Sequence, residues 1–489
     1  MVCYRYLEHT NFVSVPYWQI QTEHELEGIN FKMLSEAKYT DKAEAQEVQN
    51  RIRRRKMKII EVEVKNVQED PPLLYDLTTL QKDANIKLNL TASETLEIAQ
   101  SLYEKKFITY PRTGSRYIGE DVWEEIPVLL EVLLAYPQFK EYAKALKMSN
   151  LNKRSVNSLK VTDHHALLIT DNTASGLSAR EDVIYNLIAS RMLESLSDPC
   201  EKEVVHIIGN VSEQKFTAHS TDIVKAGWRA VRGFFDSEIP EESVESIPYL
   251  EEGNKLEIES VKLLEKKTKP KPLFTEATLL SAMEHAGKEI ENEEERNAIK
   301  ESGIGTPATR ATIIETLFAR DYMERKKKSL IPTPKGLKVY GIVKDKRIAD
   351  VSMTGMWENA LSKIESGEMM ADTFNKSIVV HTTQITGELL SLDLPEEKVK
   401  ILDCPKCKQY SVRIFDKVAK CTDEKCDFLL FRNFCGKLLS EDDVKAILSK
   451  GKSPLIKGMK SRAKKEFDAY IVLKEDGSTG FEFPVKKKK

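Results

Sequence analysis

The feature that most restricts how this 489-residue chain can fold is a set of four closely spaced cysteines. They are Cys404, Cys407, Cys421 and Cys426. Two thiolate pairs separated by a hairpin's length of chain suit tetrahedral zinc, and Val412, Ile414 and Val418 alternate between them as strand residues do. The spacing predicts a zinc ribbon over residues 400–432, which needs its metal to fold because so small a unit has little core. A redox pair or a chance cluster is the alternative interpretation.

The rest of the composition is that of an ordinary globular protein. Lys and Arg number 75 and Asp and Glu 77, so the net charge is −2, and 41% of the residues are apolar. These values exclude a histone-like, collagen-like or disordered chain. The first residues lack the apolar core of a signal peptide, and the longest apolar run, Val128–Tyr136, is too short to span a membrane. We therefore expect a cytoplasmic protein without membrane contact, in which Cys3, Cys200 and Cys435 are buried thiols.

The pattern of apolar residues predicts a multidomain fold of mixed α and β structure, in which helices interrupt a β-rich unit. The expected segments are a β-rich segment at 1–75, a helical domain at 76–200, a returning β-rich segment at 201–265, a winged-helix-like base at 272–395, the ribbon at 400–432 and a small α+β domain at 433–489. Within the helical domain, Thr91 and Glu94 have the spacing of a capping box. The helix that they begin is expected to end at Lys105-Lys106.

The segment expected to form the base has the order helix, helix, hairpin. Helical spacing covers Thr275–His285 and Thr309–Arg320, and a cationic turn follows within Tyr322–Ile331. This order is typical of winged-helix domains, which often bind nucleic acid. Winged helices also mediate protein contacts, so both interpretations stay open.

A dense basic run lies in the first β-rich segment. Asp41–Lys58 is expected to be a helix, and six of the eight residues from Arg51 to Lys58 are Lys or Arg. Such a cluster can bind phosphate. The alternative is a solvated helix end whose cations complement the helix dipole.

Tyr110 is the candidate nucleophile, although most tyrosines in turns are packing residues. Because the pKa of tyrosine is near 10, its phenol needs a nearby cation to act as a nucleophile at neutral pH. Arg112 lies two residues further on and carries a fork of donors that suits phosphate. The pair is therefore a candidate for phosphoryl transfer through a phosphotyrosine.

Five ordered motifs give this chain a resemblance to a known family. They are Asp76–Asn85, Ile108–Arg116 (ITYPRTGSR), Thr162–Ala166, Phe274–Leu279 and Gly303–Arg310. In sequence and in order they resemble motifs of type IA DNA topoisomerases, especially the topoisomerase III branch, and the cysteine cluster and the segments after it are similar too. The resemblance covers nearly the whole chain and implies a bacterial enzyme with the type IA arch.

The resemblance also implies a mechanism and a set of site residues. Tyr110 would attack a phosphodiester of single-stranded DNA, form a 5′-phosphotyrosine and later reseal the strand without ATP. Arg112 would stabilise charge on the phosphoryl group, His164 would hydrogen-bond a nearby phosphate, and Thr309 and Arg310 would contact the DNA backbone from a helix start. Without the family, His164 is a surface residue of a polar pair, and Thr309 and Arg310 belong to a simple helix cap.

The chain also departs from the family pattern. Type IA enzymes have an N-terminal Toprim domain whose acidic cluster binds Mg²⁺, and the sequence contains no paired Asp-x-Asp of that kind. Gly114 stands where the family usually has Asp, and Thr306 where some relatives have Arg. We therefore expect a Toprim-less fragment that cleaves DNA only with a separate Toprim-containing chain. The alternative is a non-catalytic module that binds single-stranded DNA.

Overall fold

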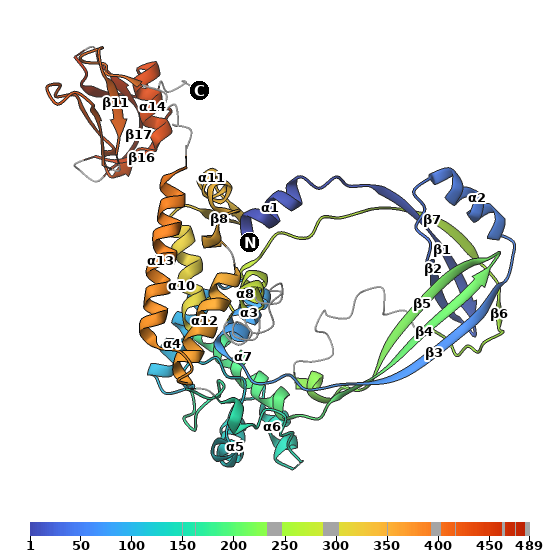
Figure 1. Cartoon of the computed structure of the whole chain (residues 1–489). Helices are drawn as coiled ribbons and strands as arrows, with labels where there is room; N and C mark the ends of the chain where they lie inside the picture. Colours follow the sequence, from blue (N-terminus) through green and yellow to red (C-terminus); the bar gives the residue numbers. More distant parts are fainter. Residues whose placement is uncertain are drawn as a thin grey trace. The chain divides into compact units, whose positions relative to one another are not determined.

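The protein is described from a computed structural model that divides into two compact units, residues 1–385 and 386–489. The described residues are 1–148, 150–161, 163–231, 247–286, 303–349, 351–392, 402–415, 417–461, 465–474 and 476–484. The fold is of mixed α and β structure and contains a large antiparallel sheet (Figure 1). Among the described helices, none combines the length and the apolar character that crossing a bilayer requires.

The large sheet of the first unit has seven strands in the order β6-β3-β4-β5-β2-β1-β7. In chain order the strands are β1 (Pro16–Leu26), β2 (Ile29–Ser35), β3 (Met57–Glu69), β4 (Cys200–Val211), β5 (Gln214–Lys225), β6 (Lys255–Leu256) and β7 (Ser260–Lys267). Strands β3 and β4 are antiparallel partners along their length, and the last residue of β3, Glu69, lies opposite the first residue of β4, Cys200. The residues between them therefore leave the sheet and return to it at one point.

Helix α2 (Lys42–Ile52) covers the core of this sheet and is shorter than the sequence predicted. The predicted helix over Asp41–Lys58 was wrong at its C-terminal end, because a turn follows Ile52 and β3 begins at Met57. Met57 and Ile59 are fully buried while Lys58 between them is exposed, which is the alternation of a strand. The basic run thus spans a helix end, a turn and the start of a strand.

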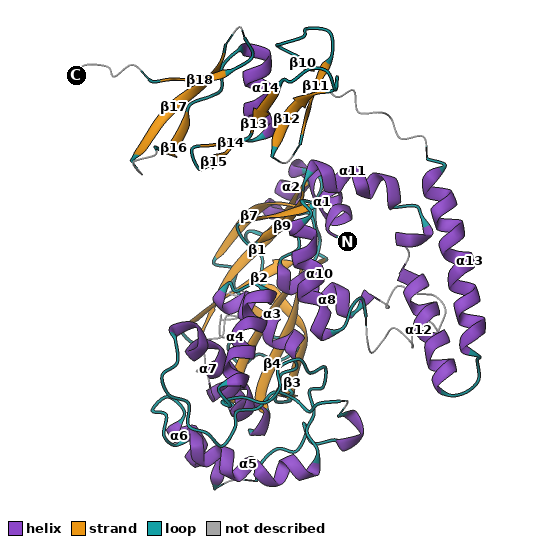
Figure 2. Cartoon of the chain, turned by 90° about the vertical axis from the view of Figure 1, so that its left-hand side faces the viewer, coloured by secondary structure: helices purple, strands orange, loops and turns teal. Residues whose placement is uncertain are grey.

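The residues between β3 and β4 are mainly helical and have their own core. They form α3 (Leu77–Leu88), α4 (Ala92–Glu104), α5 (Glu120–Leu133), α6 (Lys140–Lys147) and α7 (Ala179–Leu196) (Figure 2). The predicted capping box is confirmed, since the Thr91 hydroxyl accepts from the Glu94 N–H and the Glu94 carboxylate accepts from the Thr91 N–H. Lys105 caps the end of α4, also as predicted.

A third core in the first unit lies among helices from both ends of the unit. It is built from α1 (Val2–Thr10), α8 (Glu276–Glu284), α10 (Pro307–Ala319) and the hairpin strands β8 (Met323–Lys326) and β9 (Ser329–Pro332). The helices α11 (Pro334–Val343), α12 (Val351–Glu365) and α13 (Ala371–Leu390) follow the hairpin in the chain. Leu280, Ile314 and Leu330 bring α8, α10 and the hairpin together in one apolar cluster, and Ala92 joins it from α4. This cluster therefore connects the hairpin to the helix that precedes Tyr110.

The second unit contains the cysteines and three small antiparallel sheets. Its strands are β10 (Leu402–Asp403), β11 (Ser411–Ile414), β12 (Val418–Cys421), β13 (Leu429–Phe431), β14 (Asn433–Phe434), β15 (Lys437–Leu438), β16 (Ile456–Lys460), β17 (Glu466–Leu473) and β18 (Thr479–Glu482), and its helix is α14 (Glu441–Lys450). Of the three isolated cysteines, Cys200 is buried as expected, Cys3 is half-buried and Cys435 is exposed. The expectation for Cys435 was wrong because it lies at positive φ in the tight turn between β14 and β15.

Candidate active site

Tyr110 lies in a loop that main-chain hydrogen bonds fix on both sides. Before it, the Thr109 N–H donates to the Leu168 carbonyl at 3.0 Å. After it, the Leu77 N–H at the start of α3 donates to the Thr113 carbonyl at 3.1 Å. The loop is therefore held between an extended segment and a helix N-terminus, which limits the positions that the phenol can take.

The Tyr110 ring is half-buried and lies between two other aromatic rings. Its centroid is 4.5 Å from that of His164 and 5.4 Å from that of Tyr103, which meets it edge-on from α4. Among the described residues, the Tyr110 hydroxyl has no hydrogen-bond partner. The structure thus brings together two residues that the sequence analysis selected, and it adds Tyr103, which the sequence motifs did not indicate.

His164, which contacts this ring, and Arg112, two residues after Tyr110 in the loop, are both exposed. The His164 carbonyl accepts a 2.8 Å hydrogen bond from the Thr113 hydroxyl, which joins the His164 segment to the tyrosine loop. Thr162, the first residue of that motif, lies outside the described residues. Within the described part of the chain, Arg112 makes no ion pair or hydrogen bond, so its guanidinium is available to a ligand.

Helix α10 begins beside the same loop. A Cβ on Gly114 would lie 3.4 Å from the ring of Pro307, the first residue of α10. Thr309 is exposed in the first turn, and its hydroxyl accepts from the Thr306 N–H at 2.9 Å, which is a capping interaction. The helix start that carries two predicted site residues therefore lies against the tyrosine loop.

Arg310 is placed differently from Thr309, because it is only 2% exposed. Its Nη1 donates to the Thr78 hydroxyl at 2.9 Å and its Nε to the Ile304 carbonyl at 3.3 Å. Burial lowers the pKa of its guanidinium. In this structure Arg310 connects α10 to the N-terminus of α3, which in turn holds the tyrosine loop.

Asp76 caps that N-terminus and was quoted in the sequence only as part of a motif. Its carboxylate accepts from the Thr79 N–H at 2.6 Å and from the Thr79 hydroxyl at 2.7 Å. Burial raises the pKa of this carboxyl. The signal that could have identified it is the Asp-x-x-Thr spacing of an N-cap.

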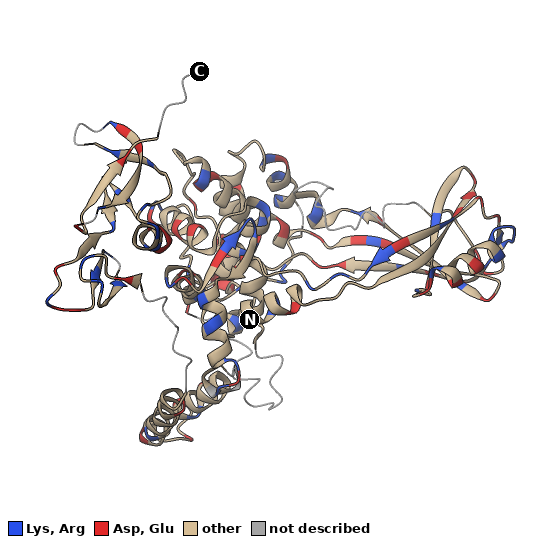
Figure 3. Ribbon diagram, turned by 90° about the horizontal axis from the view of Figure 1, so that it is seen from above, with Lys and Arg blue, Asp and Glu red and all other residues tan. Residues whose placement is uncertain are grey.

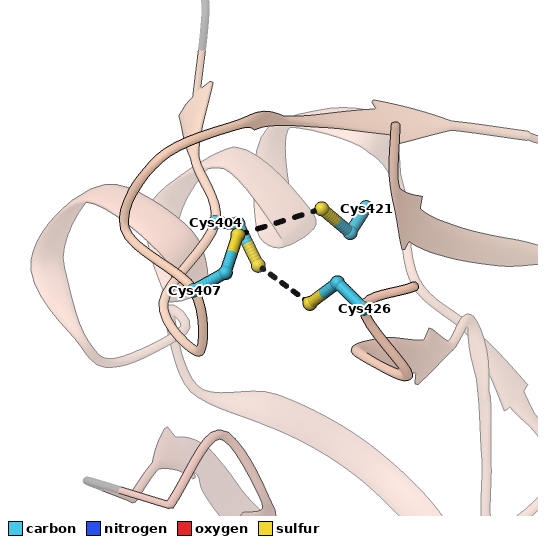
Figure 4. Close-up of side chains that lie close together, drawn as sticks. All are labelled: Cys404, Cys407, Cys421 and Cys426. Atoms are coloured by element: carbon cyan, nitrogen blue, oxygen red, sulfur yellow. Dashed lines mark hydrogen bonds between the residues drawn. The ribbon is translucent and has the colours of Figure 1, made fainter. Parts of the chain in front are cut away.

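The four cysteines of the second unit lie together, as the spacing predicted. Their sulfur atoms all lie within 4.8 Å of one another, and the Cys404–Cys426 and Cys407–Cys421 sulfur pairs are each 3.7 Å apart (Figure 4). A tetrahedral zinc with Zn–S bonds of about 2.3 Å places its sulfurs roughly 3.8 Å apart. Backbone N–H groups, first that of Gln409, lower the pKa of the Cys407 thiol to about 7, whereas burial raises the pKa of the Cys404 and Cys421 thiols. The donor set and its geometry therefore fit zinc.

A second group of metal ligands or an apolar cavity would be the other features that a site of this kind could use. Within the described ranges, the four cysteines are the one close group of three or more metal-binding side chains. A mainly apolar cavity of about 300 Å³ lies among α1, α8, α10 and α11, lined by residues such as Val2, Leu279 and Val339. None of the predicted site residues lines this cavity, so it is separate from the tyrosine site.

Comparison with known proteins gives consistent similarities. The model of the family described as DNA topoisomerase matches residues 1–376, and that of the C-terminal repeat of topoisomerase matches residues 425–484. DNA topoisomerase 3 of Bacillus licheniformis is 31% identical over 87% of this chain, and that of Shouchella clausii is 33% identical over 85%. The chain spans about 60% of the length of these relatives.

A solved structure has a similar fold. Full-length topoisomerase I from Thermotoga maritima aligns with 90% of this chain and 70% of its own, with a TM-score of 0.59 at 22% sequence identity. At that level of identity the likeness concerns the fold alone.

Proposed function

Since the chain belongs to the DNA topoisomerase family, as a type IA member similar to topoisomerase III, we propose that it carries the tyrosine half of a strand-passing enzyme. The substrate is single-stranded DNA, and the reaction cleaves one strand, passes another through the break and reseals it without ATP. The observation that carries the proposal is the fixed loop on which Tyr110 meets His164, with Arg112 unpaired beside it.

Tyr110 is the proposed nucleophile. Its oxygen forms a bond to the phosphorus while the bond from phosphorus to the 3′ oxygen breaks, so the products are a 5′-phosphotyrosine and a 3′-hydroxyl. The phenolic proton leaves Tyr110, and the departing 3′ oxygen takes up a proton. One phosphoester replaces another, so resealing needs no further energy source.

Arg112 and His164 are proposed to act on the phosphoryl group. Arg112 can approach the non-bridging oxygens with paired N–H donors, which stabilises charge that grows in the transition state. His164 touches the ring of Tyr110 and is exposed, so its imidazole can donate to a phosphate oxygen held over that ring.

Helix α10 is proposed to hold the neighbouring DNA backbone. Thr309 is exposed in its first turn, where the helix dipole favours phosphate. Arg310 contributes through its hydrogen bonds to Thr78 and Ile304, which fix α10 beside the tyrosine loop. Helices α8 and α10 with the β8–β9 hairpin form the winged-helix-like base of this proposal, and the seven-stranded sheet forms the arch.

Two metals enter the proposal differently. Zinc held by the four cysteines gives the second unit a structural centre, consistent with a zinc ribbon. Enzymes of this family use Mg²⁺ bound by Toprim carboxylates, and the described residues around Tyr110 do not form such a donor set. We assign those carboxylates to a separate Toprim-containing chain in the cytoplasm.

The proposal is tested by trapping the covalent intermediate. The chain is incubated with a 3′-labelled single-stranded oligonucleotide, Mg²⁺ and a separately produced Toprim segment of the Bacillus licheniformis relative, and is then denatured. The expected result is a labelled adduct that is lost in Tyr110→Phe and kept in Tyr117→Phe, a control from the same loop. DNA binding without an adduct in any reaction would instead support a non-catalytic binding module.

A further inference from the structure

A group of cations at one corner of the large sheet is not used by the proposed reaction. We call it the basic corner, and it consists of Arg53, Arg54, Arg55, Lys58 and Lys255. The three arginines form the turn between α2 and β3, Lys58 is the second residue of β3, and Lys255 begins β6 beside it. All five are exposed, and blue ribbon marks the end of the sheet next to α2 in Figure 3.

Acidic neighbours do not account for these cations. Arg51 pairs with Glu47 at 3.7 Å, and Lys56 pairs with Glu257. Among the described residues, none of the five members of the basic corner has an acidic partner within ion-pair distance. Glu251 and Glu252 are exposed in the turn before β6 and form no ion pair with the corner.

The helix dipole accounts at most for Arg53, which is the C-cap of α2, and not for the other four cations. Helix α2 ends at Ile52, and the Arg55 N–H donates to the Ile52 carbonyl as the turn closes. Cations complement a helix C-terminus within about its last turn. Arg51 occupies that position, whereas Arg54, Arg55 and Lys58 lie beyond it.

Two lysines of the corner lie opposite each other on neighbouring strands, where their charges destabilise the fold. Lys58 lies directly opposite Lys255 in the pairing of β3 with β6. Like charges directly opposite each other on neighbouring strands are destabilising by roughly 0.2–1 kcal/mol. An anion bound between the two ammonium groups would reverse the sign of that interaction, so the pair indicates an anionic ligand.

The chemistry of the corner fits a phosphodiester backbone rather than bases. Residues 51–60 contain no aromatic side chain, so the turn offers no ring on which an unpaired base can stack. Three consecutive arginines instead offer paired donors for phosphate oxygens, and double-stranded DNA has the denser row of phosphates. The corner lies at the edge of the seven-stranded sheet, whereas Tyr110 lies in the helical segment between β3 and β4.

We propose that the basic corner binds the backbone of double-stranded DNA, at a site separate from the single strand held at Tyr110. This inference rests on the proposed function. A protein that passes one DNA segment past another has two segments to hold, and the corner gives the second one an electrostatic contact that is independent of sequence.

The test measures how binding depends on salt. The binding constant of a blunt 20-base-pair duplex and that of a 20-nucleotide oligothymidine are measured between 50 and 200 mM salt, for the wild type and for R53Q/R54Q/R55Q. Each lost phosphate contact makes the slope of log K against log salt shallower by about 0.9 for a duplex. The expected result is a duplex slope shallower by about 2 to 3 and an oligothymidine slope that stays unchanged.

The matched control removes the same charge from another exposed surface. K140Q/K144Q/K147Q neutralises three exposed lysines of α6, and it is expected to keep the wild-type slopes. Equal slope changes in the two triple variants, no change in the arginine variant, or a change confined to oligothymidine would each overturn the inference while leaving the proposed function standing. A wild type that binds neither DNA would overturn both.

Discussion

Glu181 connects the helix that precedes Tyr110 to helix α7, and Glu181→Gln tests how firmly the tyrosine loop is supported. Its Oε1 accepts from the Lys105 ammonium at 2.6 Å and from the Ser101 hydroxyl at 2.8 Å, both at the end of α4. Its Oε2 accepts from the N–H and the hydroxyl of Ser178, each at 2.9 Å, in the capping box of α7. Glu181 as a whole residue is 7% exposed.

The magnitude follows from the pKa of this carboxyl, which the Lys105 hydrogen bond and then the Ser178 N–H lower from 4.5 to about 2. At about 1.36 kcal/mol per pKa unit, this shift limits the loss of unfolding free energy in Glu181→Gln to about 3.4 kcal/mol. Because the Lys105 side chain is 42% exposed, solvent screens part of its interaction with Glu181, and we expect a loss of about 1.5–2 kcal/mol. For a cooperative unit of 385 residues, at about 2.1 cal/mol/K per residue, that corresponds to a loss of roughly 2 °C in the unfolding temperature.

The stabilisation that Glu181 provides is expected to decrease as the pH falls. A carboxyl whose pKa is lower in the folded state stabilises the fold above its unfolded value of 4.5, and this contribution disappears as the pH falls toward about 2. The difference between wild type and Glu181→Gln should therefore be full at pH 7 and smaller by roughly two-fifths at pH 3.5. Calorimetry at both pH values measures it, with Asp182→Asn as a control that is expected to change stability by less than about 0.5 kcal/mol. Equal melting of wild type and Glu181→Gln at pH 7, or a difference that does not shrink in acid, would refute the reasoning.

Three further predictions concern the zinc centre, two glycines and the aromatic contact. Cys421→Ser should remove bound zinc and unfold the second unit, measured as zinc content and as loss of hydrogen-exchange protection confined to that unit. Gly303→Ala should lower the unfolding free energy by about 1–3 kcal/mol, because the φ of Gly303 is +65° and a Cβ would lie 2.4 Å from the Met283 carbonyl oxygen. Gly114→Ala should be tolerated, because its Cβ would meet only the Pro307 ring at 3.4 Å, and thermal melts compare the two variants. Tyr103→Ala should slow adduct formation at Tyr110 without lowering DNA affinity, while Tyr103→Phe keeps the rate; an unchanged rate in the alanine variant would show that the ring contact has no role.

Local features of the fold could be predicted where the sequence carries a local signal. The Thr91–Glu94 capping box gave the start of α4, and the cysteine spacing predicted the cluster that the second unit contains. The end of α2 could not be predicted from charge, because Lys and Arg continue from the helix into the strand. The change from helix to strand is marked only by the burial of Met57 and Ile59.

The tyrosine site shows why contacts between distant segments escape sequence reasoning. The motifs selected Tyr110 and His164 separately, but their contact depends on how the His164 segment pairs with the tyrosine loop. Arg310 was expected at a DNA-facing helix start, and a sequence cannot show that its side chain turns inward to Thr78. Burial of a charged side chain is decided by the packing of α10 on α3, which is a tertiary property.

The most direct test of the central claim is to identify the residue that becomes attached to DNA. The covalent adduct formed with the oligonucleotide and the Toprim segment is trimmed with nuclease, digested with trypsin and analysed by mass spectrometry. We expect a nucleotide on the peptide Phe107–Arg112, attached to Tyr110 through a 5′ phosphate. A nucleotide on any other peptide, or one joined through a 3′ phosphate, would contradict it.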